Sequence, residues 1–167
     1  MGTNALFFFF LILCASGALL SLFLPDRKNP LALAGVASLA SLVILLPSGE
    51  ILLSGRPFQA ELWTLPFLGK LVLSMDRLSA FFVFLTGLVF LPVSIYSAGY
   101  LQRYAGRYHL KTFSAFYHLL LGSTVLVLVS GDILSFLLSW EAMSILCYLL
   151  VNFEHEKEET TRSGFLM

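Results

Sequence analysis

Long, uninterrupted apolar stretches make up most of the chain, and short polar segments separate them. The apolar residues do not alternate with polar ones, as they would in the strands of a membrane β-barrel. A helix needs about 20 apolar residues to cross the hydrocarbon core, where lipid offers the backbone no hydrogen-bond partner. The pattern therefore predicts five transmembrane helices, over Ala5–Leu24, Leu31–Pro47, Leu78–Gly99, Thr112–Ser130 and Ile133–Asn152.

Composition agrees with an all-α integral membrane protein that forms a single membrane domain. Hydrophobic residues make up 58% of the chain and charged residues 12%, about half the charged share of a soluble domain. The formal net charge is zero, which argues against a protein that binds nucleic acid. No Lys or Arg precedes the first apolar stretch, so we interpret it as a retained helix and not as a cleaved signal peptide.

The basic residues are distributed unevenly between the two sides of the membrane. With five spans, seven of them fall on one side and three on the other, and the richer side is expected to be cytoplasmic. This orientation places the N-terminus outside and the C-terminus inside. The seven are Arg27, Lys28, Arg103, Arg107, Lys111, Lys157 and Arg162, and the three are Arg56, Lys70 and Arg77.

The connection between the second and third spans, Ser48–Met75, is the longest. It contains the turn-forming residues Ser54–Pro57, with short apolar runs on both sides at Glu50–Leu53 and Phe58–Trp63. The pattern predicts a short outer hairpin, or strand pair, between these two helices.

Glu141 is a carboxylate in the middle of the fifth apolar stretch. Placing a charge at this depth costs about 3 kcal/mol on insertion scales, so such residues are rare and usually functional. Ser144 and Tyr148 follow at spacings that place them on the same helical face, which makes Glu141, Ser144 and Tyr148 candidates for a proton relay.

His118, in the fourth stretch, is a further candidate for the relay. Counted at about 1.5 Å per residue, its depth differs from that of Glu141 by only about 5 Å. Consecutive helices joined by a short connection usually pack together, so a contact between His118 and Glu141 is possible. The alternative is that His118 faces a backbone carbonyl or lipid headgroups.

The sequence contains no GxGxxG, P-loop or HExxH motif and no set of cofactor ligands. Its two cysteines, Cys14 and Cys147, both lie in apolar stretches and do not form a metal-binding pair. We therefore predict no catalytic residue, no metal site and no cofactor site.

Several short motifs resemble one family. Met75–Phe82, Ile95–Tyr100, Gly131–Leu134 and Leu138–Glu141, in this order, are similar to the antiporter-like membrane subunits. These are the proton-translocating subunits of respiratory complex I (the NADH-quinone oxidoreductase), of Mrp-type cation/proton antiporters and of membrane-bound hydrogenases. Residues 140–144 and 153–164 look most like the hydrogenase-4 branch of this family, which includes the corresponding membrane subunit of formate hydrogenlyase. The resemblance covers about Met75 to Met167.

The resemblance implies a role for Glu141. In this family the corresponding glutamate pairs with a lysine on a broken helix later in the sequence, and the pair modulates proton transfer. Family members have about fourteen helices in two inverted repeats. The chain is therefore expected to be the N-terminal part of such a subunit, a split half or a truncation.

Two functions follow as expectations. The first is a part of a proton-translocating subunit, non-catalytic itself, in a hydrogenase- or complex-I-like oxidoreductase. Its partners would be other membrane subunits, its transported ion H⁺ or Na⁺, and its location the inner membrane of a prokaryotic cell. The alternative is a non-transporting five-helix scaffold or assembly subunit, in which Glu141 only pairs with a neighbouring subunit.

Overall fold

The computed structural model describes residues 2–65, 69–104 and 109–152. Within them, five helices are long and apolar enough to cross a membrane, as predicted from the apolar stretches. A two-stranded antiparallel hairpin lies between the second and third helices. The elements are α1 (Thr3–Phe23), α2 (Asn29–Ser54), β1 (Phe58–Leu65), β2 (Gly69–Met75), α3 (Arg77–Gln102), α4 (Leu110–Val129) and α5 (Ile133–Val151).

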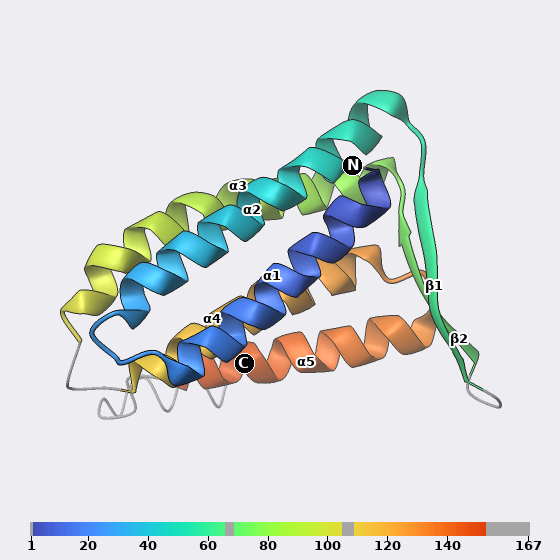
Figure 1. The fold of residues 1–167 in the computed structure, drawn as a ribbon. Coiled ribbons are helices and arrows are strands. Elements are labelled where there is room, and N and C mark those ends of the chain that lie inside the picture. The colour runs from blue at the N-terminus through green and yellow to red at the C-terminus, as the bar shows by residue number, and fades with distance from the viewer. Residues whose placement is uncertain (1, 66–68, 105–108, 153–167) are drawn as a thin grey trace.

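The helices run side by side, with the hairpin standing across one end of the bundle (Figure 1). α1 packs against both α2 and α4, α2 packs mainly against α3, and α5 packs against α4. The N-terminus lies at the hairpin end, and the connection between α1 and α2 lies at the opposite end (Figure 1). α4 is thus covered on two sides, whereas α5 is at the edge of the bundle.

α2 is longer than predicted, because it continues past Pro47 to Ser54. Proline lacks a backbone N–H and often ends a helix, but here the chain remains helical and the Ser48 hydroxyl donates to the Ile44 carbonyl at 2.7 Å. Glu50, expected in the connection, is inside α2 and accepts a hydrogen bond from Thr3 Oγ1 at 2.9 Å.

The hairpin is also displaced from its predicted position. The predicted turn at Ser54–Pro57 is instead the end of α2, where Gly55 has a φ of 69°, the left-handed conformation that commonly ends helices. The first predicted strand, Glu50–Leu53, is the last turn of α2. A glycine signal between two apolar runs can mark either a hairpin turn or a helix end, and the helical continuation decided between them.

Hydrogen bonds of the backbone and of the Asp132 side chain attach the hairpin to the connection between α4 and α5. Gly131 N donates to Val72 O at 2.8 Å, and Val72 N donates to the Asp132 carboxylate at 2.6 Å. A bridge pairs Leu73 with Ser130. The middle of β2 is therefore held at the start of α5, which couples the position of α5 to that of the hairpin.

Small residues allow helices to approach closely. Close packing of this kind holds helices together in lipid, where the hydrophobic effect does not. A Cβ atom at Gly87 of α3 would lie 2.9 Å from the Leu45 side chain of α2. At the hairpin end the packing is aromatic, with the Phe7 and Phe58 ring centroids 5.2 Å apart.

Some residues used in the sequence analysis lie outside the described residues. They are the stretch 153–164, which carries part of the family resemblance, and three of the basic residues used for the orientation, Arg107, Lys157 and Arg162.

Candidate functional site

Glu141 lies halfway along α5 on a face that no other described element covers. Its side chain is exposed, as are those of Ser144 and Tyr148, which the helical spacing places on the same face. Only Ser135 and Leu146 of α5 are buried. Glu141 makes no hydrogen bond or ion pair with another described residue. The structure therefore places the three candidates together, and directs them away from the bundle.

His118 has the opposite environment, because it is 1% exposed in the interior of the bundle. Its Nδ1 lies 2.7 Å from the Ser114 carbonyl oxygen, and its Nε2 has no partner among the described residues. The suggested contact between His118 and Glu141 is therefore not formed. The alternative, in which the ring faces a backbone carbonyl, is the one observed.

Gly17 of α1 provides the space for the His118 ring. A Cβ atom at Gly17 would lie 2.4 Å from Cδ2 and 2.6 Å from Nε2 of that ring. One turn away, a Cβ atom at Gly122 of α4 would lie 3.4 Å from Cys14 of α1. These two contacts define an antiparallel register between α1 and α4. Continued by one turn in the other direction, the register brings Ser21 to the level of Ser114.

Polar groups continue from His118 toward the connection between α1 and α2. The Ser21 hydroxyl donates to the Gly17 carbonyl at 2.8 Å, and Asn29 Nδ2 donates to the Ser21 carbonyl at 2.8 Å. Asn29 begins α2 and is fully buried. We name the group of Gly17, Ser21, Asn29, Ser114 and His118 the α1–α4 seam.

Tyr117, beside His118 on α4, faces the other way, toward α3. Its hydroxyl lies 3.0 Å from Ser94 Oγ, and its ring centroid lies 5.6 Å from that of Phe90. The Ser94 hydroxyl also donates to the Phe90 carbonyl. These polar groups are paired with one another, so they serve as contacts between α3 and α4.

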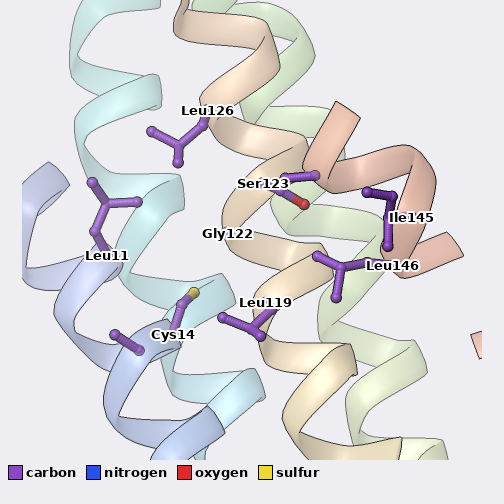
Figure 2. A pocket seen from close by; sticks show the side chains of 10 residues that line it. Leu11, Cys14, Leu119, Gly122, Ser123, Leu126, Ile145 and Leu146 are labelled. Atoms are coloured by element: carbon purple, nitrogen blue, oxygen red, sulfur yellow. The ribbon is translucent and has the colours of Figure 1, made fainter. Parts of the chain in front are cut away.

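An apolar groove of about 520 Å³ lies between α1, α4 and α5 (Figure 2). α1 contributes Leu11 and Cys14, α4 contributes Leu119 and Gly122, and α5 contributes Ile145 and Leu146. The side chains in Figure 2 are almost entirely aliphatic. Such a surface suits lipid tails or another helix, and it supplies no polar connection between the seam and Glu141.

Asp132, at the hairpin end, lies just before the α5 span. It accepts hydrogen bonds from Ser135 N at 2.8 Å, from the Ser135 hydroxyl and from Val72 N. Partial desolvation raises the pKa of this carboxyl, but the hydrogen bonds from Ser135 and Val72 outweigh it and hold the pKa below its usual value. Asp76 begins α3 in the same way, and the hydrogen bond from Ser79 N lowers its pKa.

The described residues contain no group of three His, Cys, Asp or Glu side chains that could hold a metal ion. Cys14 and Cys147 are free thiols.

Compared with known proteins, the chain matches no family model and no curated protein.

The sequence reasoning identified His118 but missed the rest of the seam. A signal was present, because Gly17 and Ser21 are four residues apart, as are Ser114 and His118. Small and polar residues at this spacing form a stripe on one helical face, the usual mark of a helix–helix contact in membranes. Asn29 was overlooked because it lies at a boundary between a connection and a span.

Proposed function

We propose that this chain is part of a proton-translocating membrane subunit of a hydrogenase- or complex-I-like oxidoreductase, with Glu141 in the ion relay. The observation that carries the proposal is the position of Glu141, in mid-span and on the uncovered face of α5. Ionisable residues at membrane depth almost always face protein or a water-filled cavity, because lipid does not solvate the charge. The outer face of α5 is therefore a surface that other membrane helices cover in the working assembly.

The carboxylate of Glu141 indicates which kind of side chain the covering helices should place next to it. A cationic side chain close to the carboxylate would favour its ionised form. Movement of that cation away from Glu141 would raise the proton affinity of the carboxylate again. Ser144 and Tyr148, on the same face, supply hydroxyl groups for hydrogen bonds to water or to the partner. The resemblance to the antiporter-like subunits supports the same arrangement, with a lysine as the cation.

Glu141→Gln in the assembled complex tests this function. The substitution keeps the shape of the side chain and removes its ionisable proton, so assembly should remain nearly normal while proton translocation per turnover falls strongly. Glu141→Asp should retain part of the activity, because the carboxylate remains but reaches less far. Ser144→Ala, on the same face, is the matched control and should have a smaller effect.

Assembly on native gels and proton translocation must be measured on the same preparations. A Gln variant that assembles fully and pumps normally removes Glu141 from the mechanism. A Gln variant with a low yield of complex, in which the surviving complexes pump normally, supports the scaffold function instead.

We further propose the orientation with the N-terminus outside, based on the excess of basic residues at the ends expected to be cytoplasmic. A reporter that is active only in the cytoplasm should be active when fused after Met167 and inactive when fused after Lys70. The opposite pattern would reverse the orientation.

A further inference from the structure

The α1–α4 seam contains several buried polar atoms that have no partner within the described residues. They are His118 Nε2, Ser114 Oγ and Asn29 Oδ1. His118, Ser114 and Asn29 are each at most 1% exposed. Buried polar atoms are paired in most native structures, so unpaired ones need an explanation, and a bound water molecule is the commonest.

The hydrogen bond to Ser114 determines which nitrogen of His118 accepts a proton. A carbonyl oxygen can only accept a hydrogen bond, so Nδ1 must carry the hydrogen that it donates to Ser114 O. In the neutral ring, Nε2 then has a free lone pair. When a hydronium ion transfers its proton to Nε2, a water molecule remains, the ring becomes an imidazolium, and its Nδ1–H bond to Ser114 is retained.

The surroundings of His118 contain few other titratable groups. α1 contributes only Cys14, and α2 has only Glu50, which lies near the hairpin end and binds Thr3. α4 contributes Tyr117 at a centroid distance of 6.4 Å and the cation Lys111, two turns before His118 on the same helical face. Neither α1 nor α2 brings a carboxylate or a cation to the ring. An imidazolium here depends on water and on backbone carbonyls for its stabilisation, which makes hydration of the seam the decisive property.

The polar atoms of the seam lead toward one end of the bundle. From His118 they pass through Ser114 and Ser21 to Asn29, at the start of α2. Asp26, in the connection between α1 and α2, has a buried carboxylate oxygen without a partner among the described residues. On the other side of His118, toward the hairpin, the next contact is Cys14 with Gly122, which offers no comparable polar group.

We propose that the α1–α4 seam is a hydrated proton site. A proton enters as hydronium from the α1–α2 end, is carried by water held along Asn29, Ser21 and Ser114, and binds His118 Nε2. The site is separate from Glu141 and gives the chain a second proton-bearing group. Its use in transport rests on the proposed function, whereas its hydration and protonation do not.

The test is solid-state NMR on the full chain in lipid bilayers, with ¹⁵N-labelled histidine. His109→Gln and His155→Gln leave His118 as the only one of the three histidines. Transfer of magnetisation from water to Nε2 reports hydration, and the Nε2 chemical shift reports protonation between about pH 8 and pH 5, the range in which histidine normally titrates. We expect a water signal at Nε2 and conversion to the imidazolium as the pH falls.

Two variants test the route. Asn29→Leu should weaken the water signal at Nε2 several-fold. Thr124→Val should leave it unchanged, because Thr124 lies beyond the Cys14–Gly122 contact, on the hairpin side of His118 and away from the proposed route. If Asn29→Leu does not fold, the double variant Ser21→Ala and Ser114→Ala replaces it, with the same expected loss.

The outcomes separate this proposal from the proposed function. A dry Nε2, or a ring that stays neutral over the whole range, overturns the proton site and leaves the seam as a helix contact. An Asn29 variant with an unchanged water signal overturns the route. None of these results depends on an assembled complex, and the Glu141 variants are measured without reference to His118, so either idea can fail alone.

Discussion

The polar groups of the α1–α4 seam and those of the outer face of α5 have contrasting environments. In the seam, a histidine is buried among small residues, and its Nδ1 is bonded to a backbone carbonyl. On α5, a carboxylate is presented outward, without a partner among the described residues. The seam is built from residues of this chain, whereas no other described element covers the α5 face.

The difference follows from the cost of burying each group. A histidine can be buried as the neutral ring, which needs only space and hydrogen-bond partners, here Gly17 for space, the Ser114 carbonyl for Nδ1 and the proposed water for Nε2. A carboxylate that carries a charge needs water or a cation to stabilise it, and apolar helices provide neither. The two regions should therefore respond differently to substitution.

The largest expected effect is on the insertion of α5. Glu141→Leu removes the charge from mid-span and should improve insertion of this helix by about 3 kcal/mol. Ser144→Leu, on the same face, is the control and should improve insertion much less. A translocon insertion assay on the α5 segment measures both. If Glu141→Leu inserts no better than the wild type, the carboxylate is not at membrane depth, and the contrast with the seam fails.

A smaller but still large effect is expected from Gly17→Ala in the seam. The added methyl group would overlap the His118 ring and would lie 2.9 Å from Val36, so overpacking should cost about 1–3 kcal/mol of stability. Gly35→Ala in α2 is the matched control, since no atom lies within 4 Å of its added Cβ, and it should be neutral or stabilising. Unfolding of the reconstituted chain measures both variants.

The double variant Gly17→Ala with His118→Ala sharpens this result. It should recover part of the loss, because the methyl group no longer meets the ring. Equal stability of the Gly17 and Gly35 variants would show that α1 and α4 do not pack as closely as described.

The smallest effect concerns the attachment of the hairpin to the start of α5. Asp132→Ala should cost about 1 kcal/mol, as the loss of a helix N-cap usually does, plus the contact with Val72. Asp76→Ala removes a similar cap, whose carboxylate makes no hydrogen bond to β2 among the described residues, so the difference between the two variants isolates the attachment.

The same attachment should depend on pH. Because the folded pKa of Asp132 is lowered, its contribution is complete above the unfolded value of about 4 and is lost as the pH falls through the folded pKa. Unfolding measured from pH 7 downward should therefore show a difference between wild type and Asp132→Ala that shrinks in strong acid. A difference that does not change with pH would mean that the carboxylate charge is not involved.

Much of the fold could be predicted from the sequence, because a membrane leaves few choices. Apolar runs of sufficient length must be helices, so the five spans were found with ends within a few residues, except at α2. The end of α2 and the hairpin were predicted less well. Gly55 is compatible with a hairpin turn and with a helix end, and local pattern does not distinguish them.

Of the candidate site, the sequence by itself determined that Glu141 lies in mid-span with Ser144 and Tyr148 on its face, because helical spacing alone decides this. Only the tertiary structure decided where each face points. In the folded chain the face of α5 that carries Glu141 points away from the bundle, and His118 packs against Gly17 and not against Glu141. The reason is that His118 of α4 could face either α1 or α5. Which of the two it faces depends on how well the surfaces of these helices fit α4, and α1 is far from α4 in the sequence. Gly17 is small enough to accept an imidazole ring, and that complementarity can be seen only when α1 and α4 are side by side.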